Sequence, residues 1–151
     1  MLDKAQAAFD IGASMVHHAG DAVVVVDPAG RVTVWNEAAE TMFGRSSREV
    51  LGATLDLIIP HNLRDRHWTG FRQTLATGDT QYAGRTLAVP ALRADGTRIS
   101  IEFTVSLLRD ERDELVGIGA IIRDVTTRWE EQRALKRRVA ELETELATLR
   151  R

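Results

Sequence analysis

The chain has 151 residues, a formal net charge of −2, 28% charged residues and no cysteine. This length suits one domain with a flanking extension, and the near-neutral charge offers no strong attraction for nucleic acid or an anionic membrane. The lack of cysteine excludes disulfides, thiolate metal sites, cysteine nucleophiles and cysteine–flavin adducts. The longest apolar run, residues 22–26, is too short for a signal peptide or a membrane span. We therefore expect a cytoplasmic protein with neither nucleic-acid nor membrane partners.

The first half of the chain predicts a helix, a hairpin and two capped helices. Apolar residues recur at near-helical spacing over residues 2–18, and Gly20 can end that helix. A β-branched run, the turn Pro28-Ala29-Gly30 and an alternating run predict a hairpin over residues 22–35. Asn36 is placed to cap a helix that begins at Glu37. Ser46 with Glu49 matches a capping box at the start of the next helix.

The middle of the chain predicts one more helix and three strands. The helix covers about residues 62–77 and ends at Gly78. The strands are expected over Gln81–Leu92, Arg98–Leu108 and Leu115–Val125, with turns at residues 94–96 and 110–114. Two strands, a block of short helices and a three-stranded meander predict an α+β domain. We expect one five-stranded antiparallel sheet with the helices on one face.

The last 26 residues, Thr126 to Arg151, contain no glycine or proline and predict one long helix. Apolar residues there alternate spacings of four and three, which is a heptad seam typical of a coiled coil: Leu135, Val139, Leu142, Leu146 and Leu149. The alternative is an amphipathic helix that packs on its own domain or on an effector. We favour a homodimer and divide the chain into an N-terminal helix (1–20), a central domain (21–126) and a coiled-coil helix (127–151).

One histidine stands out because it interrupts an apolar stripe. His67 recurs at four-residue spacing with Leu63, Phe71 and Leu75, so all four lie on one helix face. A buried imidazole needs a partner, and neutral imidazole is the commonest metal-ligand side chain. Gly70 leaves room beside the stripe for a flat ligand. The alternative is a core histidine that hydrogen-bonds to a carbonyl or a neighbouring side chain.

The remaining histidines carry weaker signals. His61 follows Pro60 and is expected in a loop. His17 and His18 are adjacent, and adjacent positions of a helix point apart. We expect both on the surface and not in one shared site.

Short motifs follow one another in a set order between residues 27 and 126: Asp27-Pro28-Ala29-Gly30-Arg31-Val32, Trp35-Asn36-Glu37-Ala38-Ala39-Glu40 with Phe43-Gly44, Glu49-Val50-Leu51-Gly52, Arg93-Ala94-Asp95-Gly96-Thr97, and Gly117 with Arg123-Asp124-Val125-Thr126. In this order they resemble the PAS family, over about residues 20–126. The resemblance implies a PAS fold and a sensory module that detects a ligand or dimerises. It also implies that strain passes through Asp124-Val125-Thr126 into the coiled coil and on to an effector protein or domain.

A narrower resemblance is to the haem-binding PAS domains of bacterial oxygen sensors. Pro60, Leu63, Arg64 and His67 match the pattern around the proximal histidine of those domains, and the 28-residue spacing from His67 to Asp95 agrees without a gap. The resemblance implies haem b held by His67, with Leu63, Gly70, Phe71, Arg85 and Leu87 around it. The implied signal is a diatomic gas, oxygen first, or a redox change.

The distal side departs from the pattern of those sensors. Their oxygen-binding arginine falls on Leu87, and a distal methionine falls on Arg85. Residues 85 and 87 project from the same face of one predicted strand, so Arg85 could donate a hydrogen bond to oxygen from one step away. The alternative is an exposed arginine at the sheet edge. The last strand lines the same pocket with either residues 118, 120 and 122 or residues 117, 119 and 121, and the sequence leaves both registers open.

The sequence carries no signature of catalysis. It has no glycine-rich phosphate loop, no His-Glu-x-x-His and no nucleophile motif, so we expect no enzyme. Three hypotheses stay open: a haem-based gas or redox sensor, a PAS module for another small apolar ligand, and a PAS dimerisation module with a filled core.

Overall fold

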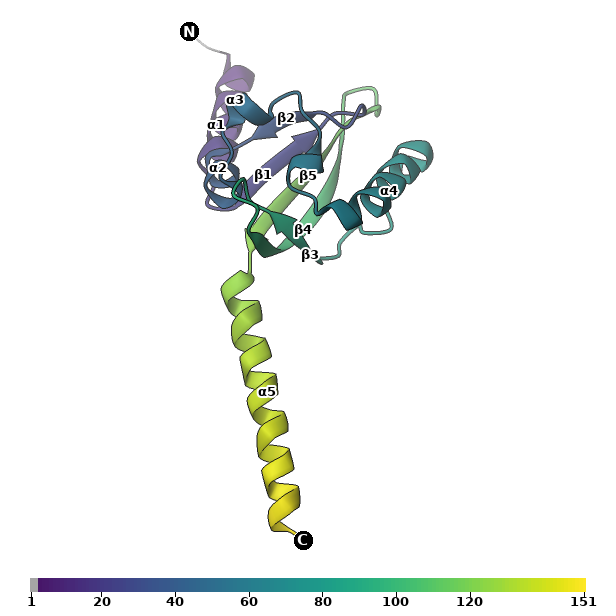
Figure 1. The fold of residues 1–151 in the computed structure, drawn as a ribbon. Coiled ribbons are helices and arrows are strands. Elements are labelled where there is room, and N and C mark those ends of the chain that lie inside the picture. The colour runs from purple at the N-terminus through teal and green to yellow at the C-terminus, as the bar shows by residue number, and fades with distance from the viewer. Residues whose placement is uncertain (1–2) are drawn as a thin grey trace.

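The computed structural model describes residues 3–151, so the first two residues of the predicted N-terminal helix lie outside the described chain. Five strands form one antiparallel sheet in the order β2-β1-β5-β4-β3 (Figure 1). Their bounds are β1 (Ala22–Val26), β2 (Val32–Trp35), β3 (Leu87–Leu92), β4 (Arg98–Arg109) and β5 (Leu115–Asp124). The first and last strands of the domain therefore pair at the centre of the sheet, as β1 and β5.

The helices are grouped between strands and at the two ends of the chain. They are α1 (Lys4–His18), α2 (Glu37–Phe43), α3 (Ser47–Val50), the 3₁₀ turns η1 (Leu55–Leu57) and η2 (His61–Leu63), α4 (Arg64–Thr77) and α5 (Thr126–Leu149). Side chains from α2, α3 and the segment after η1 pack with the strands in one core. The predicted α+β architecture with a five-stranded antiparallel sheet is confirmed.

Local signals explain where the early helices begin and end. The Asn36 side chain accepts the Ala39 N–H at 3.0 Å, and the Ser46 hydroxyl accepts the Glu49 N–H at 3.3 Å. Both predicted N-caps are present. Gly78, with φ of +68°, ends α4 in the left-handed conformation that glycine adopts without strain, and its N–H bonds the Thr74 carbonyl.

One strand begins later than predicted. The expected strand over residues 81–92 starts only at Leu87, because residues 81–84 form a turn. Gly84 takes a φ of +71°, and the Arg85 N–H bonds the Tyr82 carbonyl at 3.0 Å. The chain therefore reverses before it can join the sheet.

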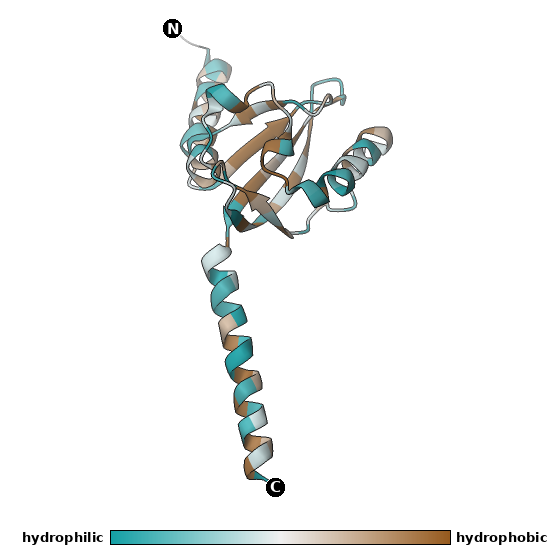
Figure 2. Ribbon diagram, in the orientation of Figure 1, coloured by the Kyte–Doolittle hydropathy of each residue, from teal (hydrophilic) through white to brown (hydrophobic). Residues whose placement is uncertain are grey.

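The buried apolar residues lie mainly on the strands and the short helices: Ala22, Val24, Val26, Val32, Trp35, Ala39, Phe43, Val50, Ile58, Ala91, Ile99, Ile101 and Ile122. Figure 2 shows the same concentration of hydrophobic residues along the strands. Of the buried residues in the described chain, none comes from α1, α4 or α5. The central sheet and α2 thus form the packed core.

The two terminal helices stand apart from this core. Helix α5 projects away from the domain, and hydrophobic bands recur along its length (Figures 1 and 2). Helix α1 lies beside α2 and exposes Phe9, Ile11 and Met15. Within residues 3–151, no helix combines the length and apolar character that crossing a membrane requires.

Candidate functional site

Helix α4 and the last residue of η2, Leu63, carry the predicted stripe. Leu63, His67, Phe71 and Leu75 are all half-buried, while Arg66 and Arg72 are exposed. The four-residue spacing places all four on a less exposed side, and Phe71 is the member of the stripe that packs against the core.

His67 is half-buried and lacks a polar partner on one ring nitrogen. Its Nδ1 is buried and has no hydrogen-bond partner among the described residues. The ring meets Trp68 edge-on, with ring centroids 4.6 Å apart, and lies nearly parallel to Phe71 at 6.5 Å. Burial lowers the pKa of His67 below its usual value, and the nearby Asp56 carboxylate only partly opposes this shift. The imidazole is therefore neutral near pH 7, the form that binds metals.

Trp68, for which the sequence predicts no role, attaches α4 to the domain. Its Nε1–H donates to Asp56 Oδ1 at 2.7 Å. Its ring also covers the β1–β2 turn so closely that a Cβ at Gly30 would come within 2.9 Å of it. This contact joins residues far apart in sequence, so no local pattern could have revealed it.

The start of α4 is held by a second attachment. The Arg64 guanidinium donates to the Ile59 and Asp56 carbonyls, each at 3.1 Å. Asp56 thus receives bonds from both Arg64 and Trp68. Together these contacts fix α4 at its N-terminal end, next to His67.

The sheet presents an apolar face on the side of the core. Leu87 lies directly opposite Phe103, Phe103 opposite Ile122, and Val105 opposite Ala120. Cross-strand partners share a face, so residues 118, 120 and 122, and not 117, 119 and 121, belong to the core side. Gly117 and Gly119 instead approach Val25 and Leu108 on the outer face, and Ile121 is 50% exposed. The register left open by the sequence is thereby settled.

Part of this apolar face is incompletely covered. Ile99, Ile101 and Ile122 are buried, whereas Leu87, Phe103 and Val105 on the same face are half-exposed, and Val89 is 38% exposed. This part of the sheet therefore leaves apolar surface uncovered. At Gly70, an added Cβ would also meet open space.

Arg85, contrary to the prediction, does not lie on the same strand as Leu87. It is exposed and precedes β3 by two residues, so it does not share a strand face with Leu87. The prediction that these two residues project from one strand is wrong, because the turn at Gly84 delays the strand. Leu87 itself lies at the start of β3 and is half-buried.

Two hollows of the surface lie elsewhere. One is bordered by Arg45, Asp56 and Arg64, and the other lies between the β3–β4 edge and the start of α5. His67 lines neither of them. They therefore do not mark the predicted site.

Comparison with known proteins identifies the fold. A family model described as "PAS fold" matches residues 11–125. The PAS domain of a protein from Colwellia psychrerythraea superposes with a TM-score of 0.67 at 21% identity, covering 80% of this chain and 98% of that one. This likeness supports the fold alone.

Relatives by sequence include sensors. An uncharacterised protein of Azorhizobium caulinodans is 41% identical over 78% of this chain. The sensor protein FixL of Bradyrhizobium diazoefficiens is 27% identical over 91% of it, and the oxygen sensor protein DosP of Escherichia coli is 28% identical over 68%. The matches span 16%, 26% and 13% of these relatives' own lengths, respectively. The chain therefore belongs to the PAS family, a family of sensory domains.

Proposed function

We propose that this PAS domain binds haem b through His67, senses a diatomic gas, oxygen first, and relays the change to its C-terminal helix. The observation that carries the proposal is the buried Nδ1 of His67, which has no partner among the described residues. It belongs to an imidazole whose pKa is lowered by burial, on the less exposed side of α4. Haem, when bound, supplies an iron centre that responds to diatomic gases and to redox state.

The surrounding side chains suit a flat apolar cofactor. Leu63 and Phe71, four residues to either side of His67, are half-buried, Gly70 leaves open space, and Leu87 offers half-exposed apolar surface on the sheet. The similarity to DosP, an oxygen sensor protein, and to the sensor protein FixL adds support. Arg85, the predicted gas-binding residue, is exposed in the loop before β3, so the proposal rests on His67 and not on Arg85.

A second candidate is a PAS module without haem. The His67 ring already packs against Trp68 and Phe71, as a core histidine would. The half-exposed face of the sheet would also take another small apolar ligand, or none. This candidate predicts the same fold and the same dimer.

An absorption spectrum separates the two candidates. Protein from haem-replete cells is compared with His67→Ala and with His61→Ala, which removes an exposed histidine. We expect a strong haem band that shifts on reduction and with carbon monoxide, is lost in His67→Ala and persists in His61→Ala. A colourless protein that takes up no added haem would contradict haem binding and favour the second candidate.

The junction between sheet and α5 supports the relay. The Val125 N–H donates to the Ser100 carbonyl at 2.8 Å, and the Ser100 N–H donates to the Thr126 hydroxyl at 2.9 Å. The Thr126 N–H donates to the Asp124 carboxylate at 3.0 Å, and Arg128 pairs with Glu102 on β4. A shift of β4 therefore acts directly on the first turn of α5.

The seam of α5 supports a parallel homodimer. In the single chain the seam residues are exposed: Leu135 is 65% exposed, Leu142 42% and Leu146 52%. Burying such leucines against a second copy stabilises association. A β-branched residue at one seam position, Val139, followed by leucine at the next, Leu142, favours a parallel two-stranded coiled coil.

A matched pair of variants tests the dimer. Leu142→Glu with Leu146→Glu should yield a monomer by analytical ultracentrifugation, because two charges would enter the seam. Ala140→Glu with Ala147→Glu adds the same charge one position beyond Val139 and Leu146, off the seam, and should leave the dimer intact. If the variant with both leucines replaced still sediments as a dimer, the coiled-coil proposal is contradicted.

A further inference from the structure

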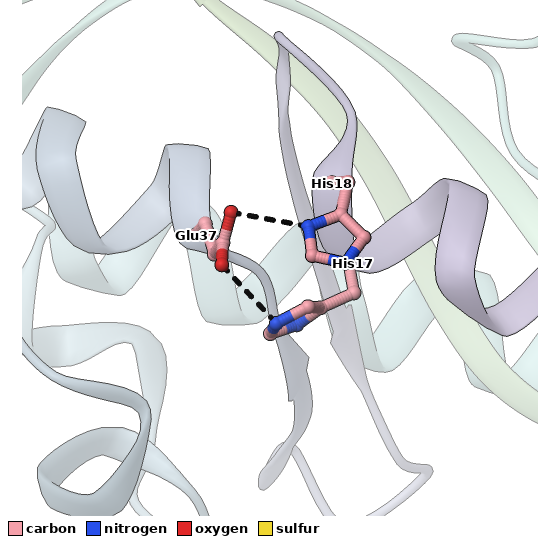
Figure 3. A group of neighbouring side chains, drawn as sticks. All are labelled: His17, His18 and Glu37. Atoms are coloured by element: carbon pink, nitrogen blue, oxygen red, sulfur yellow. Dashed lines mark hydrogen bonds and ion pairs between the residues drawn. The ribbon is translucent and has the colours of Figure 1, made fainter.

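Two histidines and one glutamate meet where α1 ends and α2 begins. His17 Nε2 lies 3.3 Å from Glu37 Oε1, and His18 Nδ1 lies 3.3 Å from Glu37 Oε2. Figure 3 shows the two rings converging on one carboxylate. One donor atom from each residue can be chosen so that all three lie within 4.8 Å of one another.

The convergence corrects the expectation that adjacent histidines could not share a site. Both are exposed, as expected, but they reach Glu37 through different ring nitrogens. His18 is the last residue of α1, and Ala19 turns the backbone away with a ψ of 145°. The ring centroids lie 4.6 Å apart with an interplanar angle of 74°. His17 and His18 point in different directions, yet both reach Glu37, His17 through Nε2 and His18 through Nδ1.

A buried network holds the two backbones that carry these ligands. Asn36, directly before Glu37, is 2% exposed. Its Nδ2 donates to the Val16 carbonyl, directly before His17, at 2.8 Å and to the Asp21 carbonyl at 3.0 Å. The end of α1 and the start of α2 are therefore fixed relative to each other before any ligand arrives.

We propose that His17, His18 and Glu37 bind one divalent transition-metal ion of the zinc class. Two imidazole nitrogens and a carboxylate oxygen form a donor set that suits such ions, whereas Mg²⁺ and Ca²⁺ prefer oxygen ligands throughout. Nitrogen and oxygen ligands at about 2.0–2.2 Å from a tetrahedral ion lie about 3.3 Å apart. Each histidine nitrogen already lies at that distance from one carboxylate oxygen, His17 from Oε1 and His18 from Oε2, so a small turn of the Glu37 carboxylate brings one oxygen to both. Water completes the coordination, because the site is exposed.

Metal binding at this position joins the N-terminal helix to the PAS core. Helix α1 has no buried residue within the described chain, so apart from the Asn36 bond to the Val16 carbonyl its packing on the domain is slight. The ion would cross-link its last turn to α2 and thereby reduce opening of that turn. The site is separate from His67, and its test does not depend on haem.

The test is a zinc titration of the tag-free, haem-free chain by calorimetry. We expect saturable binding of one Zn²⁺ per chain. Loss of a direct ligand should cost at least as much as loss of an outer-shell partner, which weakens metal binding roughly 10- to 100-fold. His17→Ala, His18→Ala and Glu37→Gln should each weaken binding by at least that amount, while His61→Ala should bind as the unchanged chain does.

Two further readouts separate a built site from nonspecific binding. With Cu²⁺, electron paramagnetic resonance should report two nitrogen ligands in the unchanged chain and one in His17→Ala. Zn²⁺ should slow amide hydrogen exchange at the end of α1 in the unchanged chain and not in Glu37→Gln. Absence of one-to-one binding, or binding that the three ligand variants leave unchanged, would overturn the proposal. All three residues are exposed, so these variants are expected to fold, and circular dichroism checks this.

Discussion

The core side of the sheet is closed around α2 and open beside α4. Around α2, Ala39 and Phe43 are 0% exposed and Val32 is 2% exposed. Beside α4, by contrast, Leu87 and Phe103 on the sheet and Phe71 on the helix are only half-buried. We infer that the α2 side carries most of the stability of the domain. The α4 side keeps apolar surface that a ligand can cover, and such regions open at lower free-energy cost.

The hydrogen bonds that hold α2 and α4 to the domain differ in the same way. The buried Asn36 side chain makes four hydrogen bonds: two to the carbonyls of Val16 and Asp21, and two from the N–H groups of Val23 and Ala39. Helix α4 is held by Trp68 and Arg64 near its N-terminal end and, at its C-cap, by Arg109 of β4, which donates to the Gly78 carbonyl. Between these two ends, Phe71 is the residue of α4 that packs against the core cluster, so the helix rests on few contacts.

The largest expected effect is on the free energy of unfolding, when one phenylalanine from each side is replaced by alanine. Phe43→Ala should lower the free energy of unfolding by about 3–5 kcal/mol, because the ring is fully buried and its removal leaves a cavity. Phe71→Ala should cost roughly 1–2 kcal/mol, since a half-buried ring loses less apolar contact. Urea denaturation of both variants, without added ligand, measures the difference. Equal losses would contradict the division into a closed and an open side.

The next effect concerns the Asn36 network. Asn36→Ala should destabilise the domain by about 2–3 kcal/mol, because it removes an N-cap and leaves buried groups unpaired. Asn36→Asp keeps the acceptor that caps α2 but removes the donors to Val16 and Asp21. Hydrogen exchange should then show α2 still protected and the end of α1 less protected. Equal loss of protection in both helices would show that the network does not act separately on α1.

Much of the fold could be predicted because its signals are local. Asn36 and Ser46 mark helix starts through bonds that span three residues. The turn at residues 94–96 is also local, since the side chain of Thr97, and then its N–H, hydrogen-bond to the Asp95 carboxylate and lower the pKa of Asp95. Alternation of apolar residues similarly reveals β4 and β5. These features depend on neighbours that the sequence places side by side.

The parts that could not be predicted depend on contacts between distant residues. The packing of Trp68 on Gly30 and the meeting of His18 with Glu37 join different elements. The late start of β3 depends on Gly84, whose left-handed conformation turns the chain where a strand pattern continued. For the candidate site, the α4 stripe was predictable from spacing, while the position of Arg85 was not. The roles of Leu63, His67, Gly70, Phe71, Arg85 and Leu87 in binding a cofactor stay predictions.

The smallest expected effect is a dependence of stability on pH through His67. Burial holds the pKa of His67 below its usual value despite the nearby Asp56 carboxylate. Between the two pKa values the unfolded chain binds more protons than the folded chain, so stability rises with pH. The stability that depends on neutral His67 is therefore fully present above the usual imidazole pKa of about 6.5. It is lost as the pH falls through the lower pKa of His67 in the folded state.

Urea denaturation of the haem-free chain at pH 7.5 and pH 5.5 measures this contribution. His67→Gln should lose less stability on acidification than the unchanged chain, while His61→Gln, which alters an exposed histidine, should behave as the unchanged chain does. The effect should also be local. Because the half-buried His67 lies on α4, acid should speed hydrogen exchange in α4 more than in α2. An equal increase in both helices would mean that the proton destabilises the whole domain, and that α4 is coupled to the core more tightly than its few attachments indicate.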